Sequence, residues 1–184
     1  RIAITVTKGE TLGLVGESGS GKSTILKAIA GLLPPSGGKI TVAGGQALAP
    51  EVEHRSPDHL RKIQLIFQNP DDSLNPRQTI AQILEQPLKL YFGLTGDALH
   101  QRSAEILDRV RLGAHYLDRL PSQLSGGEKQ RVAIARAFAA EPDLVLCDEV
   151  TSALDVSVQA AVLDLLNDFK ATQGTTYVFV SHDL

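Results

Sequence analysis

The sequence predicts an α/β domain with a mainly parallel sheet, into which a helical subdomain is inserted. Short apolar runs typical of buried strands alternate with helical patterns along the 184-residue chain. A continuous block over residues 79–140 has apolar side chains at helical spacing, for example Ile106, Leu107 and Val110. The chain is also long enough to bury one core and a small subdomain.

Individual elements follow from the same patterns. We expect strands over residues 11–15, 39–42, 62–67, 144–147 and 176–180, and residues 2–6 form a further strand-like run. Helices are expected over residues 22–31, near 79–90, 97–111 and 126–140, and from a cap near Asp155 onward. Residues 44–57 are polar and turn-rich, which is typical of a surface connection. We therefore assign residues 1–78 and 141–184 to an α/β core, and residues 79–140 to the helical subdomain.

Composition excludes several classes of function. A formal net charge of −3 gives no support for a nucleic-acid-binding surface, so no nucleic acid partner is expected. The single cysteine, Cys147, cannot form an intrachain disulfide, which favours a reducing compartment, and strand alternation places it in the core. No run approaches the roughly 18 apolar residues of a membrane span. Because the chain starts at Arg1 inside a strand-like run, we expect a piece of a longer protein, truncated at both ends.

A glycine-rich loop predicts a phosphate site. Residues 16–23 (GESGSGKS) match G-x-x-x-x-G-K-[ST] between an apolar strand and a helix. Such a loop turns its backbone N–H groups inward around phosphate oxygens; its lysine reaches the β- and γ-phosphates and its serine hydroxyl takes a place on Mg²⁺. The alternative is a flexible Gly/Ser turn that only opens a helix. The motif indicates a nucleoside triphosphate site in a phosphate-loop (P-loop NTPase) type of α/β core, without choosing between ATP and GTP or naming the reaction. The predicted nucleotide-binding residues are Gly16, Glu17, Ser18, Gly19, Ser20, Gly21, Lys22, Ser23 and Thr24.

Two carboxylates end a later apolar strand. Asp148 and Glu149 follow the run LVLC, and ligands of open α/β sheets bind at the carboxyl ends of strands. Asp148 is suited to holding Mg²⁺ through a water molecule, so we predict Ser23 and Asp148 as metal-site residues. Glu149 is suited to act as the general base that orients and deprotonates attacking water. The alternative is a pair of solvated acids at a strand end.

An unusual helix start lies at residues 124–131 (LSGGEKQR), which we call the signature segment. Ser125 and Glu128 form an S-x-x-E capping box, yet the first helical residues are Gly126 and Gly127. Each glycine costs about 1 kcal/mol against alanine in a helix interior. A strong cap followed by two glycines favours a helix end that an anion approaches closely, although a merely flexible entry is the alternative.

These three motifs, in this order, resemble the nucleotide-binding domain of ATP-binding cassette (ABC) proteins over essentially the whole chain. The resemblance implies ATP and Mg²⁺ as ligands. Gln68 is similar to the glutamine-loop residue that contacts Mg²⁺ and the attacking water, and His182 resembles the switch histidine that contacts the γ-phosphate. With Glu149, these are the predicted catalytic residues. The D-loop, which couples two active sites in the family, corresponds to Ser152, Ala153, Leu154 and Asp155.

The family pairs two such domains head to tail, and ATP on one phosphate loop is covered by the signature segment of the other. The resemblance therefore implies that Ser125, Gly126, Gly127 and Glu128 act in trans. It also implies integral membrane permease subunits as partners and a peripheral location on the cytoplasmic membrane face. The segments around Gln68 and Ser152 resemble the peptide and nickel importer branch. The predicted function is thus an ATP-hydrolysing subunit that powers an importer of peptides or a related small solute.

A soluble ABC-type ATPase acting on DNA or the ribosome is the alternative. Those chains usually carry a coiled coil or zinc module inside the cassette, whereas Lys22 and Asp148 are 148 − 22 = 126 residues apart with no heptad tract between them. A non-hydrolysing nucleotide-binding module is disfavoured by Glu149. Two departures from the family are Val150, where proline is most common, and the absence of the upstream aromatic residue that stacks on adenine. We expect the isolated chain to bind nucleotide weakly and to dimerise poorly. The solute and the identity of the second nucleotide-binding domain are not encoded in these motifs.

Overall fold

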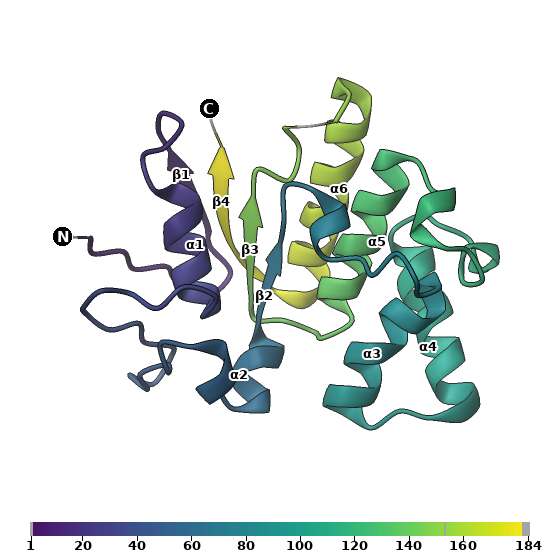
Figure 1. Cartoon of the computed structure of the whole chain (residues 1–184), viewed down its shortest axis with the longest axis horizontal. Helices are drawn as coiled ribbons and strands as arrows, with labels where there is room; N and C mark the ends of the chain where they lie inside the picture. The colour runs from purple at the N-terminus through teal and green to yellow at the C-terminus, as the bar shows by residue number, and fades with distance from the viewer. Residues whose placement is uncertain (1, 153, 182–184) are drawn as a thin grey trace.

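A four-stranded parallel sheet forms the centre of the fold (Figure 1). The computed structural model describes residues 2–152 and 154–181. The strand order is β1-β4-β3-β2, and every neighbouring pair is parallel. The strands are β1 (Thr11–Val15), β2 (Ile63–Ile66), β3 (Leu144–Asp148) and β4 (Thr176–Ser181). This is the predicted α/β fold class with a parallel sheet.

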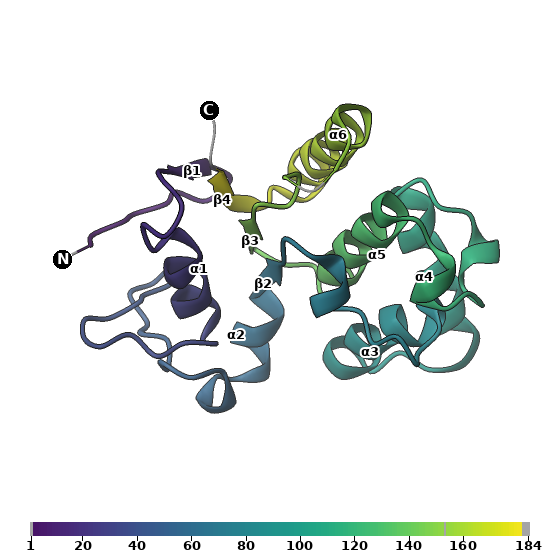
Figure 2. The same ribbon diagram turned by 45° about the horizontal axis from the view of Figure 1, so that its top comes forward.

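Helices cover both faces of the sheet (Figure 2). Helix α1 (Lys22–Ala30) lies on one face, and α5 (Gly126–Phe138) and α6 (Val156–Gln173) lie on the other. Alternation along each strand divides the core accordingly, because successive side chains point to opposite faces. In β3, Leu146 packs in the cluster that contains Leu26 of α1, while Val145 and Cys147 pack in the cluster formed with α5 and α6. Both faces of the sheet are therefore buried.

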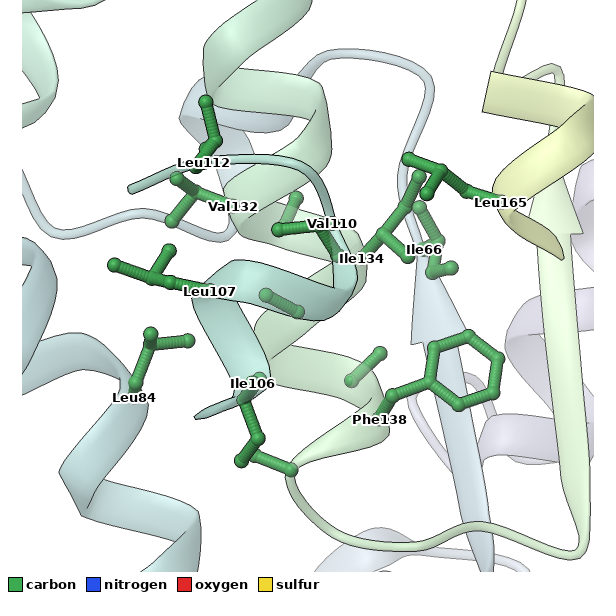
Figure 3. Close-up of a cluster of buried hydrophobic side chains, with 14 of the residues drawn as sticks. Ile66, Leu84, Ile106, Leu107, Val110, Leu112, Val132, Ile134, Phe138 and Leu165 are labelled. Carbon is green, nitrogen blue, oxygen red and sulfur yellow. The ribbon is translucent and has the colours of Figure 1, made fainter. Parts of the chain in front are cut away.

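Helix α5 joins the sheet to the helical block. That block contains α3 (Ile80–Phe92) and α4 (Gly96–Arg109), which lie beyond α5 as seen from the sheet. Figure 3 shows Val132 of α5 facing Leu107, while Ile134 faces Ile66 and Leu165 on the sheet side. Because residues 132–138 of α5 are apolar and buried except for Arg136, one continuous core runs from the sheet into the helical block.

One predicted strand is wrong, and the strand-like run at residues 2–6 forms no strand. Residues 39–42 contribute only an isolated antiparallel bridge between Thr41 and Ala47, closed by Gly44 and Gly45 at positive φ. This single bridge closes a glycine turn, and no further bridged residue pair forms beside it among the described residues, so residues 39–42 do not become a strand. The run over residues 2–6 forms no ladder with any described residue, and Ile2 is 68% exposed. Apolar, β-branched residues favour a strand only where a partner strand is available.

The remaining elements begin and end close to their predicted bounds, with two differences. Helix α2 (Pro57–Lys62) was not predicted, although Ser56 accepts a hydrogen bond from the His59 N–H and Pro57 is the first helical residue, which are standard start signals. Asp155 does stand at the N-cap of α6, but its side chain caps no described N–H group. Short 3₁₀ turns complete the chain: Val52–His54, Pro70–Asp72, Ala114–Tyr116 and Pro121–Gln123.

Candidate nucleotide-binding site

The predicted site residues gather at the carboxyl edge of the sheet, because all four strands are parallel and end there. The phosphate loop follows β1, Gln68 lies two residues beyond β2, and Asp148 is the last residue of β3. The predicted switch residue His182 follows β4 and lies outside the described residues. One edge of the sheet thus carries residues that are more than 100 positions apart in the sequence.

The phosphate loop folds around its own lysine. Lys22, the first residue of α1, is 8% exposed, and its Nζ donates to the carbonyl oxygens of Gly16 at 2.6 Å and Glu17 at 2.8 Å. Gly19 and Gly21 have φ of +80° and +93°, a conformation that favours glycine. Gly21 is the N-cap of α1 and has no side chain to cap it, so the first-turn N–H groups of this helix face the loop. A helix N-terminus of this kind is suited to bind phosphate.

A direct hydrogen bond joins the phosphate loop to the acidic strand end. The Ser23 hydroxyl donates to Asp148 Oδ1 at 2.7 Å, and Asp148 is 8% exposed. Hydroxyl and carboxylate oxygens are ligands that Mg²⁺ accepts, and this ion usually takes only one or two protein ligands and completes its shell with water and phosphate. The described residues contain no group of three or more His, Cys, Asp and Glu side chains that could hold a metal ion. The pair Ser23 and Asp148 therefore fits a Mg²⁺ ion held jointly with nucleotide phosphate.

Glu149 has an uncommon backbone conformation next to this pair. Its φ is +49°, in the left-handed region, which non-glycine residues rarely adopt and which is enriched at functional sites. Its N–H donates to the Val180 carbonyl at 3.2 Å, and its own carbonyl accepts from the Ser152 N–H and hydroxyl, both at 3.0 Å. Gln68 Nε2 donates to the Ser152 hydroxyl oxygen at 3.0 Å. The glutamine-loop and D-loop residues are thus connected through Ser152.

The signature segment begins α5 at some remove from the phosphate loop. Ser125 Oγ accepts from the Glu128 N–H at 3.3 Å, and Glu128 Oε2 accepts from the Ser125 N–H at 2.7 Å, so the predicted capping box is confirmed. Within the described part of the chain, no hydrogen bond or ion pair joins this segment to residues 16–24. The helices that the two motifs open, α1 and α5, lie on opposite faces of the sheet (Figure 2).

A cleft of about 390 Å³ lies between the start of α5 and the start of α6. The signature segment and the D-loop line it from opposite sides, through Ser125, Gly126, Gly127, Arg131, Leu154 and Asp155. Ala153, the remaining predicted D-loop residue, lies outside the described residues. The two glycines differ: a Cβ on Gly127 would lie 2.8 Å from Val158 Cγ1, whereas a Cβ on Gly126 would meet no described atom within 4 Å. Packing therefore requires glycine at position 127, while the backbone at position 126 is open to the cleft.

Two contacts of the signature segment had no signal in the sequence. The Tyr116 hydroxyl donates to Glu128 Oε1 at 2.5 Å, and this hydrogen bond lowers the pKa of the Glu128 carboxyl. Lys129 Nζ lies 2.8 Å from Asp71 Oδ1, in the turn that follows Gln68. No short motif relates positions 12 or 58 residues apart, so sequence patterns could not find either pair. Cys147 is fully buried as predicted, and burial raises the pKa of its thiol.

The rest of the described chain adds one finding relevant to membranes: none of its helices combines the length and the apolar character needed to cross a lipid bilayer.

Comparisons with known proteins find relatives among peptide-transport ATP-binding proteins. A putative peptide import ATP-binding protein of Brucella abortus is 41% identical over 185 residues, which cover all of this chain and 55% of that protein. The dipeptide transport ATP-binding protein DppF of Escherichia coli is 41% identical over 183 residues, which cover all of this chain and 54% of that protein. The oligopeptide transport ATP-binding protein OppF of Bacillus subtilis is also 41% identical, over 184 residues and 60% of its length. The chain thus spans about half the length of the curated relatives it matches.

A solved structure shares the fold. The ATP-binding cassette MJ0796, in a dimeric post-hydrolysis state bound to ADP and Pi, superposes with a TM-score of 0.83 and 33% sequence identity, over 98% of this chain and 78% of that one. Residues 1–152 match the family described as ABC transporter, and they include the phosphate loop, the signature segment, Asp148 and Glu149. This chain therefore belongs to the ABC transporter family.

Proposed function

We propose that this chain is the ATP-binding and ATP-hydrolysing part of an importer for peptides or a related small solute. The observation that carries the proposal is the 2.7 Å hydrogen bond from Ser23 to Asp148, which brings the phosphate loop and the acidic strand end of an ABC family member to one point. The peptide branch is supported by the names of the relatives, which are peptide, dipeptide and oligopeptide transport ATP-binding proteins in their own organisms.

Nucleotide binding requires an exchange of hydrogen bonds at Lys22. Its ammonium group is held by the carbonyls of Gly16 and Glu17, at the mouth of the loop where phosphate is expected. We propose that the β- and γ-phosphates of ATP take over this ammonium group, while N–H groups of residues 16–24 surround them. Mg²⁺ would be held by Ser23 and Asp148, with Gln68 close by, and would supply charge neutralisation between the β- and γ-phosphates when bound.

Hydrolysis is assigned to Glu149 as the base for the attacking water. Its left-handed backbone, next to Asp148 in the chain, is held by hydrogen bonds to Val180 and Ser152. Gln68 would be linked to Glu149 through Ser152, because its side chain donates to the Ser152 hydroxyl and that hydroxyl donates to the Glu149 carbonyl. The role of His182 at the γ-phosphate remains part of this proposal.

The signature residues Ser125, Gly126, Gly127 and Glu128 are proposed to act on the nucleotide of a second nucleotide-binding domain. Their separation from this chain's own phosphate loop supports that arrangement, as does the dimeric state of MJ0796. The D-loop residues Ser152, Ala153, Leu154 and Asp155 would lie between the two sites. We further propose the division into an α/β core over residues 1–78 and 141–184 and a helical subdomain over residues 79–140, docked on permease subunits at the cytoplasmic membrane face.

Substitution of the proposed base tests this function. In the intact protein with Mg²⁺ and ATP, Glu149→Gln is expected to lower the rate of phosphate release by at least about a hundredfold, because general base catalysis typically contributes 10²–10⁴-fold. The Glu149→Gln protein should then accumulate as an ATP-bound dimer, whose mass is measured by size-exclusion chromatography with light scattering. Glu53→Gln, an exposed carboxylate far from the strand ends, is the matched control and should hydrolyse ATP at the unchanged rate. Undiminished hydrolysis in Glu149→Gln would remove Glu149 as the base.

A further inference from the structure

We propose that Tyr116 is a positioning residue for the signature segment: its phenol fixes Glu128, and through Glu128 it sets the direction of the first-turn N–H groups of α5. The inference rests on the proposed function, in which those N–H groups meet the nucleotide of a second domain. Tyr116 itself touches no reacting atom in this proposal and acts only through Glu128.

Glu128 is held by two hydrogen bonds from different directions. Its Oε2 accepts from the Ser125 N–H at 2.7 Å, within the capping box, and its Oε1 accepts from the Tyr116 hydroxyl at 2.5 Å. Each carboxylate oxygen therefore has one partner inside the chain. Hydrogen bonds to a charged acceptor are shorter and roughly twice as strong as neutral ones, so this carboxylate is well fixed.

The start of α5 needs a restraint from outside the helix. The capping box links Ser125 only to Glu128, within the same turn, and the residues between them are Gly126 and Gly127. Glycine has the greatest backbone freedom, and Gly126 is exposed. The box joins Ser125 and Glu128 only to each other, whereas the phenol links Glu128 to another part of the fold. This link adds to the Lys129–Asp71 ion pair and to the packing of Gly127 on Val158.

Tyr116 is itself firmly placed. The next residue, Leu117, is 2% exposed, and its carbonyl accepts from the Ala81 N–H at 2.9 Å. The Arg119 carbonyl accepts from the Ile80 N–H at 2.9 Å, and the Arg119 guanidinium lies 4.3 Å from the centre of the Tyr116 ring. The backbone next to Tyr116 is thus bonded to the start of α3, and the phenol links the signature turn to this part of the helical block.

The expected consequence is a defect in catalysis without a defect in the chain's own phosphate loop. In the intact protein, Tyr116→Phe keeps the ring and its contact with Arg119 but removes the hydroxyl. We expect kcat for ATP hydrolysis to fall about three- to tenfold, which corresponds to one modest hydrogen bond. Binding of a fluorescent ATP analogue to the phosphate loop should be unchanged. Tyr91→Phe, in the last turn of α3, removes a half-buried phenol from the same helical block and is the matched control with unchanged kcat.

Mixed dimers separate positioning in trans from a general loss of structure. Two differently tagged copies are purified together, one of which carries Lys22→Ala, so that a single composite site remains active. That site combines the intact phosphate loop with the signature segment of the Lys22→Ala copy. Tyr116→Phe should lower activity when it is placed on the Lys22→Ala copy and should have no effect on the other copy.

Equal losses in both arrangements, or no loss in either, would overturn the inference. As a second check, Tyr116→Phe should cause no further loss in a Glu128→Ala background, because both changes remove the same link; additive losses would also count against it. Failure of the proposed function has a different signature. In that case the unmodified protein does not hydrolyse ATP, or Lys22→Ala leaves the rate unchanged, whatever residue stands at position 116.

Discussion

At the scale of single residues, the nucleotide site is held in shape by contacts that ligands must replace. The Lys22 ammonium is bonded to two loop carbonyls, and the Ser23 hydroxyl to Asp148. Both side chains are therefore already near the places where phosphate and Mg²⁺ are expected, and little conformational entropy is lost when they change partners. The same interactions keep a buried lysine and a buried aspartate satisfied while no nucleotide is bound.

Gln130 is a buried polar residue both of whose side-chain polar atoms, Nε2 and Oε1, lack such a partner among the described residues. It lies in α5 and is 1% exposed. An unsatisfied buried polar group costs about 1–3 kcal/mol. Gln130→Met keeps the unbranched shape and removes both groups, so the free energy of unfolding should rise by about 1–3 kcal/mol, or about 2–10 °C in Tm for a chain of this size.

The control for this change is Gln101→Met on the exposed side of α4, which should stay within about 0.5 kcal/mol of the unmodified protein in the same thermal melt. A Tm of Gln130→Met at or below that of the control would mean that Gln130 is paired in solution, for example with a buried water molecule.

At the scale of elements, the start of α5 must pack closely against α6 and must also leave its first backbone N–H groups accessible. Gly127 lies against Val158 of α6, whereas Gly126 faces the cleft between the two helices. Helix α5 thus approaches α6 closely at one glycine and leaves its backbone accessible at the other. The first turn of α5 is therefore fixed by packing at Gly127 and has an accessible backbone at Gly126.

Alanine at each position should separate these demands. Gly127→Ala places a Cβ 2.8 Å from Val158 Cγ1, a β-branched side chain with few rotamers, so unfolding free energy should fall by about 1–3 kcal/mol. Gly126→Ala meets no described atom and should be neutral or stabilising by up to about 1 kcal/mol, yet should lower ATP hydrolysis. Denaturant melts and phosphate release measure both quantities.

The double variant Gly127→Ala with Val158→Ala removes the contact and should recover part of the lost stability. A Gly127→Ala protein as stable as the Gly126→Ala protein would show that α6 yields to the added methyl group.

Local patterns predicted the elements whose signals are local. The apolar run 144–147 became β3, and the capping box at Ser125 opened α5 as expected. Residues 39–42 have strand composition but form only the bridge from Thr41, because pairing depends on a partner that no local pattern encodes. The hydrogen bonds from Ser23 to Asp148 and from Tyr116 to Glu128 show the same limit within the site. Motif order implied the first pair, and nothing in the sequence implied the second.

At the scale of the whole molecule, the site joins elements that pack on different faces of the sheet. Helix α1 packs on one face of the sheet and α5 on the other, while Ser23 and Asp148 join the phosphate loop to β3. A ligand that bridges these parts stabilises the native state as a whole, because it binds only where the sheet edge is assembled.

Nucleotide should therefore raise the thermal stability of the intact protein. With Mg²⁺ and ATP at about 100 times the dissociation constant, linkage adds about 2.7 kcal/mol, or roughly 4 °C in Tm for a protein about twice as long as this chain. Glu149→Gln is used as the background so that ATP persists during the scan. Lys22→Ala should abolish the shift in Tm, because the lysine that meets the phosphates is removed.

The matched control is Lys27→Ala, which changes an exposed lysine later in the same helix and should keep the full shift in Tm. Differential scanning fluorimetry reads all of these proteins in parallel. A shift of equal size in Lys22→Ala would mean that ATP stabilises the protein from a site other than the phosphate loop.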